Sequence, residues 1–413
     1  MLRFKLETKG AVLIEGTKWC GKTTTAEQIA QSVLYMSEPD ELERRKQVAD
    51  TNIRLLLEGA TPRLIDEWQI VPKFWDAVRF EVDHRQKVGQ YILTGSAVPI
   101  STEQINHTGT GRFAWLKMRP MSLWESGESN GSISLRALFD GETLSGIADK
   151  IDIQQLAFLV CRGGWPQAID LSERGALAQA FDYVDAIAHN DISRVDEIRR
   201  DAAFTKRVLR SYARHQGSQA SLSALYEDIK INEENSFNEN TISSYLHALR
   251  KIFVIEDMPA WNPNLRSKAA IRTSDTHYFV DSSIATATLG LSPKDLVKDL
   301  NTFGLLFETM AIRDLRVYAD ALDGEVSHYR DNNGLECDAV MHLRNGNYGL
   351  IEIKIGGDNA IETGANNLLK LESKIDTTKM PNPAFKMVLC GLGSYAYRRE
   401  DGVYVVPIGC LKP

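Results

Sequence analysis

The sequence predicts a protein of the α/β class with more than one domain. Three observations support this: a glycine-rich loop between a strand and a helix near the start, three helices and a strand in the middle, and a hairpin, a helix and two strands near the end. The 413 residues exceed what one hydrophobic core usually serves, so two or three domains are expected. A hydrophobic fraction of 43% with 25% charged residues is ordinary for a globular protein.

Composition excludes several classes of protein. The net charge of -7 argues against a surface coated with basic residues for nucleic acid, although a local basic face stays compatible with it. The five cysteines are scattered without a CxxC pair, which disfavours a zinc site and a disulfide framework and indicates a cytoplasmic location. No apolar run of about 18 residues predicts a membrane span, and the N-terminus lacks the features of a signal peptide.

The loop GTKWCGKT, residues 16–23, fits the pattern G-x-x-x-x-G-K-[ST]. It lies between an apolar strand, AVLIE, and a helix-like run, TTAEQIAQSVLYM. Glycines let backbone N–H groups surround phosphates, Lys22 would reach the β and γ phosphates, and Thr23 would ligate Mg²⁺. The residues expected to bind the nucleotide are Gly16, Thr17, Lys18, Trp19, Cys20, Gly21, Lys22, Thr23 and Thr24.

A second strand, RLIDEW at 63–68, completes the expected nucleotide site. Asp66 is the expected magnesium partner, and Glu67 is placed to orient or deprotonate an attacking water. In the third strand, QYILTGSA, a hydroxyl of Thr94 or Ser96 either senses the γ phosphate or is a plain polar strand end.

Two further residues near this site have alternative interpretations. Arg112 is a candidate positive charge for the transition state, in its own site or in that of a neighbouring subunit. The thiol of Cys20 is either a redox switch with a lowered pKa or a small packing group.

These motifs resemble a family of bacterial and archaeal AAA+-like P-loop ATPases, largely uncharacterised, with a winged-helix region and a C-terminal PD-(D/E)XK nuclease-like domain. The resemblance implies ATP as the nucleotide and covers most of the chain. It rests on the segments GTKWCGKTT, LIDEWQIVPKFWDAVR, YILTGSA, the Gly111–Arg112 pair before RPMSLWE, GGWPQAI, NDISRV, GLLFETM, LECDAV and GLIEIK.

The middle of the chain begins with a Ser- and Gly-rich stretch, 126–146, which predicts a surface loop. The helical segments IADKIDIQQLAFLVCRG and ALAQAFDYVDAIAHNDISRV follow and resemble the small lid of AAA+ proteins. Three helices and a strand then span 205–261.

The third of these helices, NENTISSYLHALRKI, begins at a predicted N-cap, Asn240. Its expected apolar stripe is Ile242, Tyr245, Leu246 and Leu249, and its expected outer face is Ser243, Ser244, His247, Arg250 and Lys251. A winged helix would dock this face in a DNA major groove, with charge added by Arg266, Lys268 and Arg272. Interdomain packing or protein binding is the alternative.

The last part contains a predicted helix with Glu308 and a hairpin, LECDAVMHLRNGNYGLIEIKI. A three-residue loop, 344–346, with a positive φ at Gly346, sets Val340 opposite Leu350 and Asp338 opposite Glu352. A two-residue turn would instead set Asp338 against Ile353. Opposed carboxylates about 5 Å apart could share one Mg²⁺, whereas without a cation they repel each other.

Lys354 points to the same strand face as Glu352 and could orient or activate a water against a phosphodiester. Together Glu308, Asp338, Glu352 and Lys354 resemble the PD-(D/E)XK constellation in their order along the chain. The alternative is an ordinary charged strand face on an α/β domain.

The expected domains are a P-loop ATPase core (1–125), a helical lid (126–200), a winged-helix-like module (201–275) and an α/β restriction-endonuclease-like domain (276–413). The expected function is Mg²⁺-dependent ATP binding and hydrolysis, coupled to a module that binds DNA or cuts nucleic acid. One alternative is a nucleotide-dependent regulatory switch with an inactive nuclease-like scaffold, and another is a small-molecule kinase. Assembly of several copies of this chain into a homo-oligomer is a further possibility.

Overall fold

The protein is represented by a computed structural model that describes residues 1–95, 109–149, 151–196, 198–230, 237–263 and 274–413. The chain divides into two compact units. Unit 1 contains Met1–Arg119, His189–Arg200 and His247–Val254, and unit 2 contains Pro120–Ala188, Asp201–Leu246 and Ile255–Pro413. Within the described ranges, no helix is long and apolar enough to cross a membrane.

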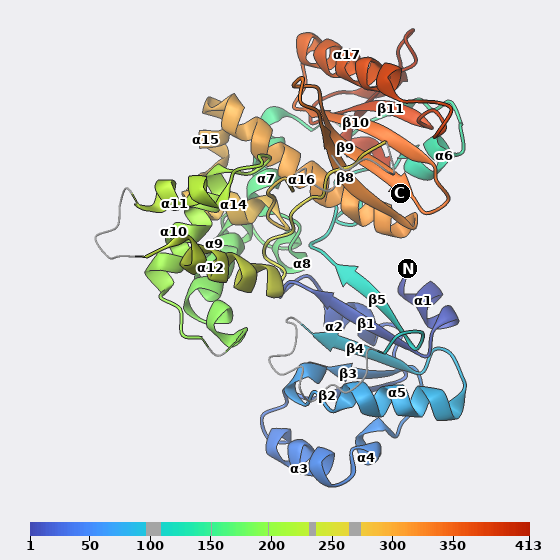
Figure 1. Ribbon diagram of the computed structural model, residues 1–413, viewed down its shortest axis with the longest axis vertical. Coiled ribbons are helices and arrows are strands. Elements are labelled where there is room, and N and C mark those ends of the chain that lie inside the picture. Colours follow the sequence, from blue (N-terminus) through green and yellow to red (C-terminus); the bar gives the residue numbers. More distant parts are fainter. Residues whose placement is uncertain (96–108, 150, 197, 231–236, 264–273) are drawn as a thin grey trace. The chain divides into compact units, whose positions relative to one another are not determined.

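A parallel sheet forms the centre of unit 1 (Figure 1). Its strand order is β2-β3-β4-β1-β5, so β4 lies between the strand that precedes the glycine-rich loop and the strand that ends in Asp66. All carboxyl ends share one edge because the strands are parallel. The strands are β1 (Ala11–Gly16), β2 (Ser32–Tyr35), β3 (Arg63–Asp66), β4 (Tyr91–Gly95) and β5 (Phe113–Met118).

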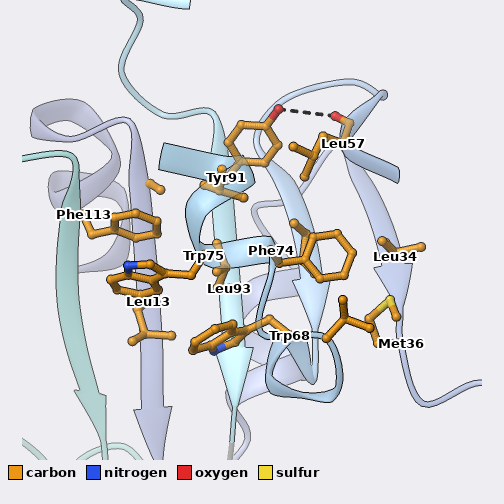
Figure 2. Close-up of a cluster of buried hydrophobic side chains, with 14 of the residues drawn as sticks. Leu13, Leu34, Met36, Leu57, Trp68, Phe74, Trp75, Tyr91, Leu93 and Phe113 are labelled. Atoms are coloured by element: carbon orange, nitrogen blue, oxygen red, sulfur yellow. Dashed lines mark hydrogen bonds between the residues drawn. The ribbon is translucent and has the colours of Figure 1, made fainter. Parts of the chain in front are cut away.

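Both faces of this sheet are covered, as parallel sheets require. One face packs with α5 in an aromatic cluster, in which the rings of Trp75 and Phe113 stack with centroids 4.1 Å apart (Figure 2). The other face packs Val12 and Ile14 with Leu2 and Ala26. The helical elements of this part are α1 (Leu2–Thr8), α2 (Lys22–Glu27), α3 (Leu42–Asn52), α4 (Arg54–Leu57), η1 (Trp68–Ile70) and α5 (Phe74–Arg85).

Two local expectations for unit 1 are wrong. The helix after the glycine-rich loop ends at Glu27, and Ser32–Tyr35 is a strand because each of its residues finds a parallel partner on β3. From the sequence, the first 16 residues, MLRFKLETKGAVLIEG, are also expected to run straight into a strand, but helix α1 precedes β1 and buries Leu2 and Leu6.

Unit 2 contains a seven-stranded sheet with the order β7-β12-β13-β11-β10-β9-β8. Helix α16 carries Glu308, and α17 follows β10 (Figure 1). The elements of this part are α14 (Ser282–Leu289), α15 (Pro293–Lys298), α16 (Leu300–Ala321), β8 (Gly324–Arg330), β9 (Glu336–Leu343), β10 (Tyr348–Lys354), α17 (Asp358–Lys374), β11 (Phe385–Cys390), β12 (Tyr395–Arg398), β13 (Tyr404–Pro407), η4 (Ile408–Cys410) and β14 (Leu411–Lys412).

The predicted hairpin register is confirmed. Leu350 pairs with Val340, and the Leu343 N–H donates to the Asn347 carbonyl at 2.8 Å, which leaves a three-residue loop. Gly346 takes a φ of +92°, a conformation that glycine adopts without steric cost. The regular ladder ends at the pair Ile351–Ala339, one pair before Asp338 and Glu352.

The Ser- and Gly-rich stretch is not a surface loop. It contains β6 (Ile133–Ser134), α6 (Leu135–Phe139) and β7 (Gly146–Ile147). Strand β6 pairs with β14, β7 pairs with β12, and the ring of Phe139 meets that of Phe385 edge-on at 5.0 Å. Sequence reasoning missed this because the pairing partners lie more than 240 residues away.

The helical elements between β7 and α14 are α7 (Ile153–Arg162), α8 (Pro166–Ile169), α9 (Glu173–His189), η3 (Asp191–Arg194), α10 (Ala202–Arg214), α11 (Leu222–Lys230) and α12 (Glu239–Lys251). Antiparallel bridges then join Ile255 to Phe279 and Met258 to Thr276. The predicted apolar stripe of α12 is confirmed, since Ile242, Tyr245, Leu246 and Leu249 are all buried.

The N-cap prediction for α12 is wrong. Asn238 caps this helix, because its side-chain oxygen accepts from the Thr241 N–H at 3.0 Å. Of the residues expected on the outer face, Ser243, His247 and Arg250 are exposed. Arg266, Lys268 and Arg272 lie outside the described residues.

A buried charge network connects distant parts of unit 2. The guanidinium of Arg313 pairs with Asp281 at 2.8 Å and with Asp314 at 2.7 Å, and all three side chains are at most 2% exposed. Asp281 also accepts from the Gly164 N–H, and Asp314 accepts from the Leu123 N–H. The motif GGWPQAI needs Gly164 because a Cβ there would lie 2.1 Å from the Met121 carbonyl oxygen and 2.9 Å from the guanidinium of Arg313.

The two units do not follow the expected four domains. Most of the expected lid, 126–188, belongs to unit 2, and only 189–200 belongs to unit 1. The reason is that β6, β7 and α7 take their partners from C-terminal elements, whereas 189–200 contacts the first 119 residues.

Candidate functional site

The glycine-rich loop of unit 1 surrounds the amine of its own lysine. Lys22 is buried, and its Nζ donates to the carbonyls of Gly16 at 2.9 Å and Thr17 at 2.7 Å. Burial lowers the pKa of Lys22. A Cβ on Gly16 would lie 2.0 Å from the Met118 carbonyl oxygen, so only glycine fits at this position. The loop therefore holds the Lys22 ammonium against its own carbonyls, a position from which a phosphate bound by the loop would draw it.

Helix α2 and strands β3 and β4 bring two hydroxyls to one carboxylate at the carboxyl edge of the sheet. The hydroxyls of Thr23 and Thr94 both donate to Oδ1 of Asp66, each at 2.7 Å. Asp66 is 7% exposed and Thr94 only 1%. These groups offer only oxygen atoms, the ligands that Mg²⁺ prefers, so the residues present fit that ion.

Glu67 follows Asp66 in sequence and has an unusual backbone conformation. Its φ of +54° lies in the left-handed region, which is uncommon for a residue other than glycine. Burial raises the pKa of Glu67, while the amide of Gln69 donates to its carboxylate. A carboxyl that is held in this conformation with a raised pKa is suited to accept a proton near neutral pH.

The other loop residues differ in exposure. Trp19 is 41% exposed with a φ of +66°, Thr17 is fully buried, and Thr24 is exposed on the first turn of α2. Cys20 is 2% exposed, and burial raises the pKa of its thiol. A raised pKa favours packing over the redox switch, since the thiolate is the reactive form.

Two of the expected residues are not brought to this site. Ser96 lies outside the described residues. Arg112 precedes β5 at the amino edge of the sheet, about 20 Å from the carboxyl edge, because the strand has six residues of about 3.3 Å each. Its Nε is bound to Asp83 at 2.7 Å. A role for Arg112 in its own site is therefore wrong, and a role in a neighbouring subunit's site stays a prediction.

A second cluster of charged side chains lies in unit 2, at the end of the β9–β10 ladder. The ammonium of Lys354 lies 3.0 Å from Asp338 Oδ2 and 2.8 Å from Glu352 Oε2. Asp338 Oδ2 also accepts a hydrogen bond from the Ile353 N–H at 2.7 Å. The regular β9–β10 pairing ends before this residue. Lys354 thus supplies the positive charge that two neighbouring carboxylates need.

Glu352 contains an unpaired buried atom. Its side chain is 2% exposed, and its Oε1 has no hydrogen-bond partner among the described residues. Burial, with the charge of Asp338 adding to it, raises the pKa of Glu352 to about 8. Buried carboxylate oxygens are rarely left without a partner, so this atom indicates a missing ligand.

Glu308 lies on α16 and receives a hydrogen bond from the hydroxyl of Tyr278. Burial and the charge of Asp338 raise its pKa to about 8. The charges of Asp338, Glu352 and Lys354 all act on Glu308. The structure therefore brings the four residues predicted in this region into one electrostatic cluster.

A Mg²⁺ ion fits this second cluster, within limits. In the part of the chain that the structure describes, no group of three or more His, Cys, Asp and Glu side chains is arranged to hold a metal. Mg²⁺ is commonly bound through one or two carboxylates, with waters in the remaining positions. Asp338 and the free Oε1 of Glu352 are sufficient for such a site.

Sequence reasoning missed three residues that contact the predicted ones. Asp191 pairs with Lys18, Gln69 holds Glu67, and Tyr278 holds Glu308. Only Gln69 is near in sequence to the residue that it contacts, two positions after Glu67. Asp191 lies in NDISRV, a motif already part of the resemblance, whereas no local signal singles out Tyr278.

Comparisons with protein families cover most of the chain in three separate segments. Residues 8–126 match the model of an AAA domain. Residues 153–295 match the domain of unknown function DUF8612, and residues 303–411 match the domain of unknown function DUF4143. None of these segments reaches half of the chain, and no curated protein matches it.

Similar solved structures include three archaeal proteins. The Walker-type ATPase PABY2304 of Pyrococcus abyssi shares 13% identity over 70% of this chain and 93% of its own, with a TM-score of 0.41. The Orc1 protein of Aeropyrum pernix in complex with DNA shares 12% sequence identity, over 70% of this chain and 87% of its own, with a TM-score of 0.22. The Hef helicase domain of Pyrococcus furiosus shares 13% sequence identity, over 89% of this chain and 78% of its own, with a TM-score of 0.20. At such scores these likenesses carry no argument.

The N-terminal parallel sheet, its glycine-rich loop and the Thr23–Asp66 contact define a P-loop nucleotide-binding domain. More particularly, residues 8–126 are similar to AAA domains, as the family match indicates. The matches to the remaining segments assign neither a winged helix nor a nuclease.

Proposed function

We propose that unit 1 binds ATP with Mg²⁺ and hydrolyses it. The observation that carries this proposal is the convergence of Lys22, Thr23 and Asp66 at one edge of the sheet. Lys22 would exchange its contacts with Gly16 and Thr17 for the β and γ phosphates. Thr23 and Asp66 would hold Mg²⁺, which neutralises phosphate charge when bound.

In this proposal Glu67 orients the attacking water and accepts its proton. Its raised pKa keeps the proton affinity closer to neutral pH than that of an ordinary glutamate. Gln69 supports this role because its side-chain amide fixes the carboxylate of Glu67. Thr94 supports the neighbouring Asp66, whose orientation it helps to fix.

The first prediction concerns ATP binding by Lys22→Ala. Removing the ammonium should weaken binding of Mg²⁺-ATP by about 10-fold to 100-fold, the size of a charge-assisted hydrogen bond to phosphate. The measurement is a titration with a fluorescent ATP analogue. Lys46→Ala serves as the control, since Lys46 lies on α3 and pairs with Glu43. Equal affinity for wild type and Lys22→Ala would contradict the proposed site.

We further propose that nucleotide state is coupled to a nucleic-acid-binding or nuclease-like activity of unit 2. The orphaned Oε1 of Glu352 supports a Mg²⁺ ion between Glu352 and Asp338. Such an ion would stabilise negative charge on a phosphodiester, and Lys354 could hold the attacking water. Helix α12 is divided between the two units after Leu246. Its exposed Ser243, His247 and Arg250 support a DNA-facing role for this helix, with protein binding as the alternative.

The second prediction is that metal-dependent cleavage needs Glu352. Glu352→Gln keeps the shape but removes the charge, so cleavage of DNA or RNA with Mg²⁺ or Mn²⁺ should fall by about 100-fold or more. Glu372→Gln is the matched control, because Glu372 on α17 pairs with Lys386. If wild type cuts no nucleic acid with either metal, a nucleotide-dependent switch with an inactive scaffold takes the place of the nuclease. Phosphate transfer to a small metabolite would favour the kinase.

The third prediction concerns pH. Because the pKa values of Glu308 and Glu352 are both raised to about 8, these side chains stay protonated in the folded state at pH values where unfolded glutamates ionise. The free energy of unfolding should therefore fall as pH rises from about 5 to about 8, and Mn²⁺ binding should tighten over the same range. Thermal unfolding with and without Mn²⁺ measures both. A flat profile in wild type, or an equally steep one in Glu352→Gln, would contradict this assignment.

A further inference from the structure

Lys18 is a second lysine of the phosphate loop and is held by an acid from a distant segment. Its Nζ lies 2.6 Å from Oδ1 of Asp191. The Lys18 side chain is 39% exposed and that of Asp191 is 10% exposed, so the anion is fixed in the protein while the cation borders on solvent. Lys18 is therefore the more mobile partner, and its flexible stem could carry the ammonium elsewhere.

Asp191 lies in a segment that has ion pairs and hydrogen bonds of its own. It begins the short helix η3 within His189–Arg200, which belongs to unit 1 although it lies 70 residues beyond β5. Arg200 binds both oxygens of Asp196, at 2.6 and 2.8 Å, and donates to the Ile192 carbonyl at 3.0 Å.

The positive charge of Lys18 affects the pKa values of two residues of the proposed site, Lys22 and Glu67. Burial lowers the pKa of Lys22, and the charge of Lys18 lowers it further. Burial raises the pKa of Glu67, and the same charge opposes that rise. Lys18 belongs to the same glycine-rich loop as Lys22, four residues before it. The terminal phosphate of ATP would lie between the Lys22 amine and the Glu67 carboxylate.

We propose that Lys18 is a γ-phosphate-binding lysine that Asp191 holds while the site lacks ATP. The inference rests on the proposed function, since it needs ATP in the loop. The terminal phosphate and the Asp191 carboxylate are both anions and compete for one ammonium. ATP therefore draws Lys18 away from Asp191 and loosens the segment 189–195, whereas ADP lacks the competing group and leaves the pair intact.

The experiment compares the full-length chain with Asp191→Asn, Lys18→Met and Lys18→Arg. Each is titrated with Mg²⁺ and either ADP or a hydrolysis-resistant ATP analogue. Asp191→Asn should bind the ATP analogue about fivefold more tightly and Lys18→Met about fivefold more weakly, the size expected for one partly exposed charge pair. Affinity for ADP should change by less than about twofold in both. Lys18→Arg keeps the cation and should retain the preference for the ATP analogue.

Asp196→Asn is the matched control, because it removes a carboxylate from the same segment without touching the loop. It should leave the ratio of ATP to ADP affinity unchanged. Amide hydrogen exchange is the second measurement: the ATP analogue should speed exchange at 189–195 in wild type and change nothing further in Asp191→Asn.

The outcomes separate this inference from the proposed function. If wild type binds both nucleotides but the Lys18 and Asp191 variants alter ATP and ADP affinity equally, or not at all, the assignment of Lys18 is wrong and the ATP site stands. If wild type and Lys22→Ala bind neither nucleotide, the proposed function itself fails. Should Lys18→Met unfold, a lost ATP preference in Lys18→Arg would still overturn the inference.

Discussion

Glu67→Gln is expected to slow ATP turnover by about 100-fold or more while ATP binding persists, because the amide keeps the shape of the side chain but accepts no proton. Glu67 is suited to this role by its left-handed backbone, by the contact from Gln69 and by the rise in its pKa on burial. Turnover is measured as phosphate release, and binding as the affinity for a fluorescent ATP analogue.

The pH dependence of turnover gives an independent test of Glu67. A base with a raised pKa loses its function on acidification at a pH above the usual value for glutamate, so wild-type turnover should fall early in an acid titration. Glu81→Gln is the control, since Glu81 lies on α5 and pairs with Arg85. Unchanged turnover in Glu67→Gln would assign the water-orienting role to another residue.

Arg313→Met is expected to lower the free energy of unfolding of unit 2 by about 3–5 kcal/mol, because it leaves Asp281 and Asp314 buried without their shared cation. Few single substitutions lower the free energy of unfolding by as much. The two carboxylates also accept from Gly164 and Leu123, so their disturbance reaches the GGWPQAI segment. Denaturant titration, followed by tryptophan fluorescence, measures the loss.

Arg399→Met is the matched control for this network. Arg399 also pairs with two acids, Glu362 and Asp401, but its side chain is 21% exposed and its loss should cost less than about 1 kcal/mol. A similar small loss in both variants would mean that water reaches the Arg313 network and that the segments of unit 2 are held by apolar packing instead.

The features predicted best were those encoded within short stretches of sequence. The loop 16–23 and the acid of RLIDEW can be recognised from the sequence, because residue type and spacing are enough to predict a phosphate-binding site. The hairpin register followed from one glycine with a positive φ and from alternation along β10, so the sequence alone predicts that Asp338 and Glu352 lie close together.

Other features depend on partners far away in the chain. The stretch 126–146 is polar and rich in glycine, yet it pairs with strands near residue 400. Ser32–Tyr35 follows a helical pattern, and only its partner β3 makes it a strand. Arg112 was placed by its nearness in sequence to the third strand, whereas the direction of β5 puts it at the opposite edge of the sheet.

The discontinuous composition of unit 1 has a consequence for how the protein is made. Its segments 1–119, 189–200 and 247–254 are joined by chain that folds into the other unit. During synthesis, the ribosome must therefore deliver 254 of the 413 residues before the nucleotide-binding unit can be completed. Its final closure is a long-range event, which is slow and leaves apolar surface exposed in the meantime. A gene fragment ending at residue 125 would encode a nucleotide loop without Asp191, and we expect such a fragment to need chaperones.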